Sequence, residues 1–273
     1  MIALKDETFR NFRDFIYEKS GIYIPDTKKY FIENRLSKRV EENKLASFDD
    51  YLYMLKYNNS ISELNVLFDK ITTNETFFFR ELQQLEVLTG QIIPKIRSES
   101  KSATLKIWSA ASSTGEEPYT IAMMLMENPK TAGIKFEVLA SDLSESVLQK
   151  AREATYGQYS TRNIPPNYLK KYFKQADGNA YALNADVRSK VKFVQINLLD
   201  ASKMRTIRDI DVVLCRNVLI YFDKKAKVSV VTSIYESLKN GGYFFIGMAE
   251  SLHDVTRAFK PAIIDKTVVY QKA

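Results

Sequence analysis

Polar side chains follow several short apolar runs in the second half of the chain, and their types could hold a cofactor that carries ribose. Asp142 ends one run, Asn197 ends another, and Arg216 with Asn217 ends a third. Ligands of open α/β sheets bind at the carboxyl ends of the strands, where an acidic side chain can accept hydrogen bonds from ribose hydroxyls. Asp142 could instead cap the helix expected after it, although Ser144 could serve as that cap.

The loop after the apolar run LKIWSA has the composition of a cofactor loop without the usual phosphate motif. Its sequence, SAASSTGEEPYTIA, is rich in small residues that let a ligand approach the backbone. A dinucleotide site would carry G-x-G-x-x-G here, but this loop has a single glycine, Gly115, followed by Glu116 and Glu117. Glutamates repel phosphates and suit a cofactor with hydroxyls and a positive charge. These features favour S-adenosylmethionine, whose sulfonium methyl group transfers without a covalent enzyme intermediate.

Composition removes other reaction classes. One histidine, His253, and one cysteine, Cys215, cannot assemble a zinc cluster or a histidine-activated nucleophile, so no metal is expected. The single cysteine fits a reducing compartment. The charged start and the lack of a long apolar run predict a cytoplasmic protein that does not insert into a membrane. The net charge of +7 favours acidic partners.

The spacing of the apolar residues divides the chain into two parts. Apolar residues recur at three- and four-residue spacings from Asp6 to about Phe79, which predicts a small all-helical domain over residues 1–79. A helix and a polar linker are expected over 80–103. Short β-branched and aromatic runs then alternate with helical segments over 104–273, which predicts a Rossmann-like α/β domain whose mostly parallel sheet has helices on both faces. The expected strands are LKIWSA, FEVLASD, KFVQIN, DVVLCRN, GYFFIGM and TVVYQK.

Two stretches depart from the parallel pattern. The final stretch, AFKPAIIDKTVVYQ, has no room for a crossover helix, so its last strand should pair in an antiparallel hairpin. Residues 157–191 contain Pro165-Pro166 and an Asp177-Gly178 turn signal, which predict a small antiparallel β insertion in the main domain.

Six segments, in this order, resemble the chemotaxis receptor methyltransferases of the CheR family: TTNETFFFRE, WSAASSTGEEPYTIAM, ASDLSESVLQKAREATY, INLLD, CRNVLIYFDK and LKNGGYFFIGMAESL. The resemblance extends from the N-terminal helices nearly to the last strand. It implies a class I methyltransferase fold and transfer of the methyl group of S-adenosylmethionine to glutamate side chains of chemoreceptors. The products would be a glutamate γ-methyl ester and S-adenosylhomocysteine.

The resemblance also implies roles for individual residues. Arg80 and Tyr221 would lie beside the transferring methyl group and are the catalytic candidates, although Tyr221 could instead simply cover the sheet. Glu116 would support the site without touching the cofactor. The residues expected to contact the cofactor are Asn74, Thr76, Arg80, Glu117, Asp142, Asn197, Leu198, Arg216 and Asn217.

The chemistry suits these residue types. A substrate glutamate has a reference pKa of about 4.3, so it is already an ionised nucleophile at neutral pH and needs no general base. Attack of a carboxylate on a sulfonium annihilates two charges, which a dry site favours. Phe77, Phe78 and Phe79 could exclude water while Arg80 and Tyr221 orient the carboxylate.

A basic segment near the N-terminus, KKYFIENRLSKR, is the candidate docking surface. Such a run is usually only a solvated face, but the resemblance implies that this helix docks on the acidic, helical cytoplasmic region of a chemoreceptor. The compact turn KQADGNAYAL lacks the longer glycine-bearing turn of members that tether to a receptor's C-terminal pentapeptide, so no such tether is expected. We expect a monomer. The docking candidates are Lys28, Lys29, Arg35, Lys38 and Arg39.

Alternatives from other classes remain at this point. A non-catalytic S-adenosylmethionine-binding module in a signalling pathway would keep the same fold. A nucleic-acid methyltransferase suits the positive charge but predicts an Asn-Pro-Pro-Tyr-like motif after the fourth strand, where this chain has RNVLIY. No nucleic acid partner is therefore expected, and the missing glycine fingerprint disfavours a nicotinamide dehydrogenase.

Overall fold

The computed structural model describes residues 2–58, 60–99 and 103–273. Within them the chain forms two compact units, each interrupted in sequence. The first comprises Met1–Thr73 and Tyr221–Ala226, and the second comprises Asn74–Ile220 and Lys227–Ala273.

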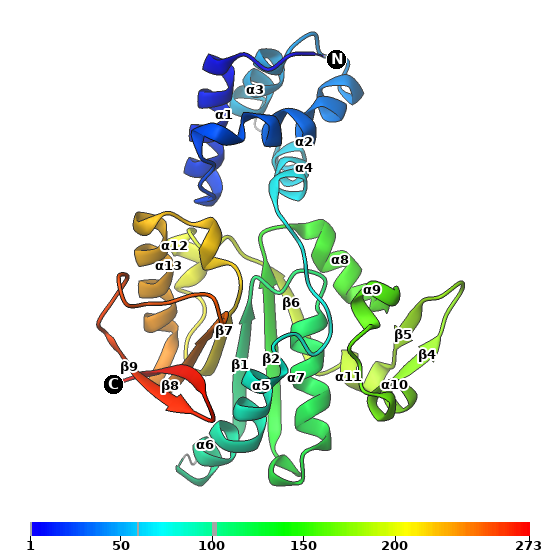
Figure 1. Ribbon diagram of the computed structural model, residues 1–273, viewed down its shortest axis with the longest axis vertical. Helices are drawn as coiled ribbons and strands as arrows, with labels where there is room; N and C mark the ends of the chain where they lie inside the picture. Colours follow the sequence, from blue (N-terminus) through cyan, green and yellow to red (C-terminus); the bar gives the residue numbers. More distant parts are fainter. Residues whose placement is uncertain (1, 59, 100–102) are drawn as a thin grey trace. The chain divides into compact units, whose positions relative to one another are not determined.

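The first unit is helical (Figure 1). Its elements are α1 (Asp6–Ser20), η1 (Asp26–Lys28), α2 (Lys29–Glu42), α3 (Phe48–Tyr57) and α4 (Ile61–Ile71). Ser47 and Ser60 cap α3 and α4 by accepting hydrogen bonds from backbone N–H groups of the first turn. Phe12 of α1 contacts the ring of Tyr51 in α3, with 6.1 Å between the centroids, and both side chains are fully buried. Aromatic packing of this kind contributes to the core of the unit, together with buried aliphatic side chains of α1, α2 and α4.

A short segment from the second half of the chain, Tyr221–Ala226, belongs to this helical unit. An isolated antiparallel bridge pairs Ile22 with Phe222. The hydroxyl of Tyr17 donates to the carboxylate of Asp223, at 3.0 Å from Oδ2 and 3.1 Å from Oδ1. Helix α1 and the chain after it therefore hold this segment through both backbone and side-chain hydrogen bonds.

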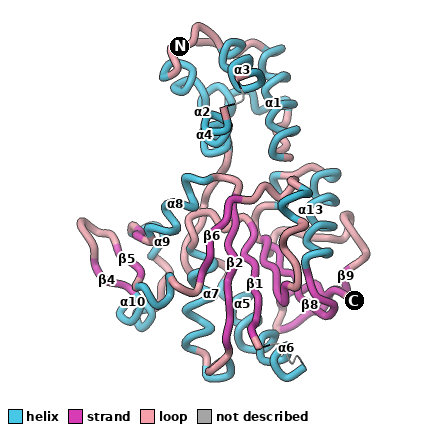
Figure 2. Tube along the Cα trace, turned by 180° about the vertical axis from the view of Figure 1, so that it is seen from behind, coloured by secondary structure: helices cyan, strands magenta, loops and turns pink. Residues whose placement is uncertain are grey.

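The second unit is built on a seven-stranded sheet with the order β6-β2-β1-β7-β8-β10-β9 (Figures 1 and 2). The neighbours from β6 to β8 pair in parallel, whereas β10 pairs antiparallel with both β8 and β9. The predicted mostly parallel sheet and terminal antiparallel hairpin are thus confirmed. Its strands are β1 (Thr104–Ala110), β2 (Lys135–Asp142), β6 (Val191–Gln195), β7 (Ile210–Cys215), β8 (Leu238–Ile246), β9 (Phe259–Ile264) and β10 (Thr267–Lys272).

The middle of the sheet is covered on both faces. All six residues of β7 are buried, and successive side chains of a strand point to opposite faces. Packing on both sides is what makes such a strand a nearly continuous apolar run. Two predicted strands were too long at their polar ends, because β6 ends at Gln195 and β7 ends at Cys215. The polar residues that follow form turns, described below.

The helices of the second unit connect and flank these strands (Figure 2). The helical stretch predicted from Glu81 onward contains one π-helical turn, η2, between two α-helical pieces. None of the helices within the described residues is long and apolar enough to cross a membrane. These elements are α5 (Leu82–Val87), η2 (Leu88–Ile92), α6 (Ile93–Glu99), α7 (Glu116–Glu127), η3 (Pro129–Thr131), α8 (Glu145–Glu153) and α12 (Ala201–Met204), together with η4 (Leu219–Tyr221) and α13 (Lys224–Ser237), whose residues Tyr221 and Lys224–Ala226 belong to the first unit.

A separate three-stranded antiparallel sheet, with the order β3-β5-β4, lies between β2 and β6 in the sequence. The small antiparallel insertion is therefore confirmed. Gly178 occupies the left-handed region with φ of 66° in the turn between β4 and β5, a conformation that glycine adopts without strain. Its elements are β3 (Thr155–Tyr156), α9 (Gln158–Thr161), α10 (Pro166–Tyr172), β4 (Phe173–Gln175), β5 (Tyr181–Leu183) and α11 (Ala185–Arg188).

Candidate functional site

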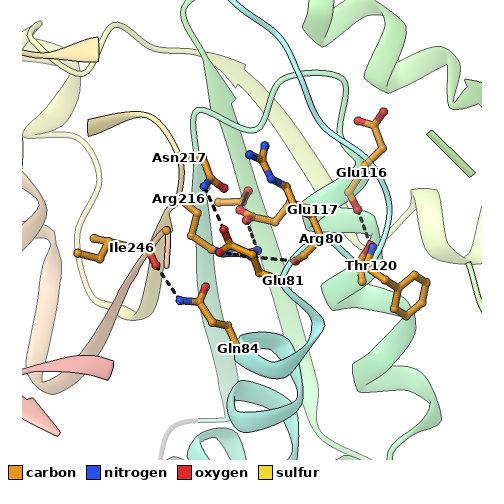
Figure 3. A network of polar contacts seen from close by, with 12 residues as sticks. Arg80, Glu81, Gln84, Glu116, Glu117, Thr120, Arg216, Asn217 and Ile246 are labelled. Carbon is orange, nitrogen blue, oxygen red and sulfur yellow. Dashed lines mark hydrogen bonds and ion pairs between the residues drawn. The ribbon is translucent and has the colours of Figure 1, made fainter. Parts of the chain in front are cut away.

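A buried arginine organises the carboxyl end of β7 (Figure 3). The side chain of Arg216 is only 2% exposed. Its Nη1 donates to Glu117 at 2.8 Å, and its Nη2 donates to Glu81 at 3.0 Å and to the backbone carbonyl of Arg80 at 2.7 Å. A guanidinium can satisfy several acceptors at fixed angles. Arg216 therefore joins the end of β7 to the segment before α5 and to the start of α7.

Asn217 and Glu81 extend this network. The Nδ2 of Asn217 donates to Glu81 at 3.1 Å, and the backbone of Asn217 is left-handed with φ of 58°. Burial acts to raise the pKa of Glu81, but the charge of Arg216 and the hydrogen bonds from Asn217 and Arg216 outweigh it, so the pKa lies below its ordinary value. Glu81 is therefore ionised at neutral pH.

The loop between β1 and α7 has an unusual backbone conformation. Ala111, Ser113 and Gly115 all have positive φ, and a β-carbon added to Gly115 would lie 2.9 Å from that of Ala151. Only glycine fits there without displacing a neighbour. Glu117 lies in the first turn of α7 and accepts a hydrogen bond from Ser109 of β1 at 2.7 Å, in addition to the one from Arg216.

Asp142, at the end of β2, supports this loop. Its Oδ2 accepts from the backbone N–H of Ser113 at 2.8 Å, and its Oδ1 accepts from that of Ser144 at 3.0 Å. Ser144 is the residue that caps α8, by accepting from Val147. The competing role of Asp142 as helix cap is thus filled by its neighbour, and the carboxylate holds the loop after β1 against the end of β2.

Asn197 forms a tight turn after β6. Its Oδ1 accepts from the backbone N–H of Leu199 at 3.0 Å, and its carbonyl accepts from Asp200 at 2.9 Å. This side-chain turn ends the strand and places the buried Leu198 between Asn197 and the next helix. Asn197 and Leu198 therefore follow β6 at the same edge of the sheet at which Asp142 follows β2.

The three phenylalanines lie in different environments. Phe78 and Phe79 are buried, and Phe78 packs edge-on against Tyr156 and Phe173 of the insertion. Phe77 is only half-buried. The backbone N–H of Phe79 donates to the hydroxyl of Thr120 on α7 at 3.2 Å, and the residue is left-handed with φ of 59°. The chain is thus turned sharply just before Arg80.

Arg80 lies beside the Arg216 network without joining it through its side chain (Figure 3). Its Nη1 donates to the carbonyl of Glu75 at 2.7 Å, and its guanidinium lies 5.8 Å from the centroid of the Phe77 ring. Asn74 is exposed and Thr76 is half-buried in the stretch without regular structure that leads to these residues.

Glu116 is a buried carboxyl group next to the cofactor loop. It is 1% exposed, and burial raises its pKa above the ordinary value. It accepts hydrogen bonds from Thr114 at 2.7 Å and from Ser160 of the insertion at 2.8 Å. The carbonyl of Ser160 in turn accepts from the backbone N–H of Phe78 at 3.0 Å. Glu116 therefore links the loop, the insertion and the phenylalanine segment.

Sequence reasoning missed Glu250. Its carboxylate accepts three backbone hydrogen bonds, from Asn217 at 2.9 Å, Gly247 at 2.7 Å and Ile220 at 3.2 Å. It therefore fixes the turn after β7 to the end of β8. Glu81 was also missed. Both acids stand within the segments quoted above, but nothing in their spacing identifies a partner so far away in the chain.

The remaining predicted residues lie in the helical unit. Tyr221 is part of the segment held by α1, and its catalytic role stays a prediction. The guanidinium of Arg39 forms an ion pair inside the helical unit with the buried Glu63. Glu63 also accepts a hydrogen bond from the hydroxyl of Tyr51 at 2.7 Å. Arg35 is exposed and donates to carbonyls at the end of α4. Lys28 and Lys38 are also exposed, and Lys38 lies 3.8 Å from a carboxylate oxygen of Glu42. Lys29 pairs with Asp6 at 2.5 Å.

The residues of the second unit fit a cofactor that offers both hydroxyls and cationic groups. Carboxylates lie near the strand ends, and the loop after β1 consists largely of small residues. Several buried atoms also find no hydrogen-bond partner among the described residues, including Ser112 Oγ, Ser113 Oγ and Arg216 Nε. Buried polar atoms are normally satisfied, so unpaired ones at the cofactor loop suit a bound ligand.

Two family models match the chain. The model described as "CheR methyltransferase, all-alpha domain" matches residues 7–72, and the one described as "CheR methyltransferase, SAM binding domain" matches residues 74–268. Chemotaxis protein methyltransferase 2 of Vibrio cholerae is 37% identical over 272 residues, covering 99% of this chain and 94% of the relative. The chemotaxis protein methyltransferase of Escherichia coli is 34% identical over 261 residues, covering 94% of this chain and 89% of the relative.

Proposed function

The chain belongs to the CheR family of chemotaxis methyltransferases and uses S-adenosylmethionine as its cofactor, and from this premise we propose that it methylates glutamate side chains of chemoreceptors. The product is a glutamate γ-methyl ester, with S-adenosylhomocysteine released. The observation that carries the proposal is the match of both family domains, over nearly the whole chain, to chemotaxis methyltransferases.

The cofactor-binding residues are proposed from the strand-end geometry. Glu117 and Asp142 flank the loop after β1, where the buried hydroxyls of Ser112 and Ser113 find no partner among the described residues. Arg216 and Asn217 hold Glu81 in its ionised form, which suits the cationic groups of the cofactor. The other proposed contacts are Asn74, Thr76, Arg80, Asn197 and Leu198.

The bound cofactor supplies a sulfonium methyl group that a carboxylate can attack directly. The substrate glutamate is ionised at neutral pH, so the protein has no proton to remove. Arg80 can orient that carboxylate, because within the described residues its guanidinium donates only to the carbonyl of Glu75 and keeps other N–H groups available. We propose that Tyr221 contributes a second hydrogen bond to the same carboxylate. Buried Phe78 and Phe79 beneath Arg80 help to keep water from the reaction.

Receptor docking is assigned to the basic face of α2. Lys38 of α2 and Lys28, just before it, are exposed, and a charge reversal there should weaken methylation of an acidic receptor helix in a salt-sensitive manner. Arg35 and Arg39 are poorer test positions, because both make hydrogen bonds within the helical unit. The compact turn between β4 and β5 supports action without a pentapeptide tether.

The decisive experiment is incubation with methyl-labelled S-adenosylmethionine and receptor cytoplasmic fragments, followed by mild base. Base-labile label on glutamate is expected. Cofactor binding without any labelled receptor would support the non-catalytic signalling module instead, and label that resists base would indicate a different acceptor.

The catalytic assignments have their own test. Arg80→Ala and Tyr221→Phe should each lower kcat by about 100-fold, the typical loss for a group that acts in the transition state. The dissociation constant for S-adenosylmethionine, measured by calorimetry, should change much less. Turnover at the wild-type rate in both variants would remove these two residues from the mechanism.

A further inference from the structure

A second arginine, Arg162, shares an aromatic ring with Arg80. Its guanidinium carbon lies 3.8 Å from the centroid of Phe77 and 3.8 Å from that of Tyr159, whereas the guanidinium carbon of Arg80 lies 5.8 Å from the same Phe77 ring. Two cationic groups therefore lie within about 10 Å of each other at an exposed edge of the second unit. Arg162 has no role in the candidate site or in the mechanism proposed above.

We propose that Arg162 binds a second carboxylate of the substrate, on the same helix as the glutamate that Arg80 orients. This inference rests on the proposed function and adds a preference for substrates with a neighbouring acid. On an α-helix, side chains three or four residues apart lie on one face, one turn from each other. The acid that Arg162 recognises is accordingly placed three or four residues from the methylated glutamate.

Contacts with neighbouring residues hold the side chain of Arg162 in one position. The guanidinium stacks on two rings, and its Nη1 donates to the carbonyl of Tyr159 in α9. Stacking covers the faces of the guanidinium and leaves its N–H edge as the surface for a ligand. A side chain fixed in this way loses little rotamer freedom when it binds a carboxylate.

Glu75 connects Arg80 with Tyr159, one of the two rings on which Arg162 stacks. Glu75 accepts from Arg80 Nη1 with its backbone carbonyl, at 2.7 Å, and from the Tyr159 hydroxyl with its carboxylate, at 2.9 Å. Its carboxylate is thus engaged by Tyr159. Among the described residues, no carboxylate accepts a hydrogen bond from Arg80 or Arg162, whereas the guanidinium groups of Arg152 and Arg216 both pair with carboxylates. Two guanidinium groups that pair directly with no carboxylate among the described residues are complementary to two carboxylates of a ligand.

The ordinary explanation is that Arg162 is a solvated surface arginine packed on aromatic rings. That role would leave substrate preference unchanged when the residue is replaced. Arg162 is exposed and Tyr159 is 55% exposed, so a helix can reach them without displacing the core. Charge complementarity commits the occupant to an acidic helix of the receptor.

The test uses the full chain, saturating S-adenosylmethionine and two helical receptor peptides. One peptide carries a glutamate four residues from the acceptor glutamate, and the other carries glutamine there. The wild-type KM should be about five- to tenfold lower for the acidic peptide, a difference typical of one charge-assisted hydrogen-bonded contact. Arg162→Ala should remove this preference and leave the affinity for S-adenosylmethionine unchanged.

Two variants sharpen the result. Arg162→Glu should reverse the preference, so that a peptide with lysine at the flanking position becomes the better substrate. Arg257→Ala, at another exposed arginine of the same unit, should keep the wild-type preference. Peptide binding measured by fluorescence anisotropy, with S-adenosylhomocysteine present, should follow the same order without relying on turnover.

Each outcome decides between the ideas. Equal KM ratios in the wild type and in Arg162→Ala would overturn the role of Arg162 while leaving glutamate methylation intact. No base-labile label with any peptide or receptor fragment would overturn the proposed function, and this inference with it.

Discussion

Replacement of Arg216 by methionine should be among the most costly single changes in the second unit. The variant keeps the length of the side chain but removes a charge that is 2% exposed and paired with Glu81 at 3.0 Å and Glu117 at 2.8 Å. Removal of one member of a buried ion pair leaves an uncompensated charge and costs about 3–5 kcal/mol. Because the side chains of Glu81 and Glu117 keep 17% and 16% exposure, we expect the lower end, about 3 kcal/mol.

Urea unfolding followed by fluorescence measures this cost. The chain has a single tryptophan, Trp108, buried in β1, so its emission reports on the second unit alone. The matched control is Arg152→Met, which removes a pair with Glu145 of 2.6 Å whose side chains are 43% and 44% exposed. An exposed pair contributes only about 0–1 kcal/mol, so this control should be nearly neutral.

The pH dependence gives an independent check. In the wild type the pKa of Glu81 is lowered, so its contribution to stability is present above its unfolded pKa and is lost as pH falls through the folded value. Arg216→Met removes the main favourable cause of that shift. The difference in stability between the two proteins should therefore be largest near pH 7 and should shrink toward pH 4. A loss of unfolding free energy below about 1 kcal/mol at pH 7, or a loss that becomes larger at acidic pH, would refute the view that the buried ion pairs of Arg216 stabilise the fold.

Further expectations concern the residues around this network. Glu250→Ala should lower the free energy of unfolding by about 2–4 kcal/mol, because three backbone donors lose a charged acceptor, whereas the exposed Glu236→Ala should change it by less than about 0.5 kcal/mol. Gly247→Ala places a β-carbon 2.7 Å from Asn217 Nδ2 and should weaken binding of S-adenosylmethionine in calorimetry; unchanged affinity would argue against a role for Asn217. The raised pKa of Glu116 means that its contribution to stability is full below its unfolded pKa and is lost as pH rises through the folded value. Glu116→Gln should therefore gain stability relative to the wild type as pH increases from about 4 to 8, and parallel pH profiles in denaturation would contradict this.

The periodicity of the chain was enough to predict the sheet. β7 reads as an unbroken apolar run because both of its faces are covered, and the last hairpin followed from the lack of room for a crossover helix. These features depend on local spacing. The ends of β6 and β7 were misplaced, because Asn197 and Asn217 form turns that depend on their own hydrogen bonds and backbone angles and not on hydrophobicity.

The site was less predictable, because its polar contacts join distant parts of the chain. Arg216 was singled out from its place after a strand, but its partner Glu81 lies 135 residues earlier. Arg39 was assigned to a docking surface although it pairs with Glu63. One signal was present, since Glu63 stands at four-residue spacing with Leu67 and Ile71 on the apolar side of α4. A carboxylate in that position requires a buried partner.

The assignment of Tyr221–Ala226 to the helical unit has a consequence for how this protein can be divided. The chain passes between the two units after Thr73, after Ile220 and again after Ala226, so neither unit is a continuous piece of sequence. A fragment that begins at Asn74 would carry Phe222 and Asp223 without the partners Ile22 and Tyr17. Exchange of helical domains between relatives must therefore replace two separate stretches of the gene together. A chimera that exchanges only the first stretch would combine Phe222 and Asp223 of one protein with the partner residues of another, next to the candidate catalytic tyrosine.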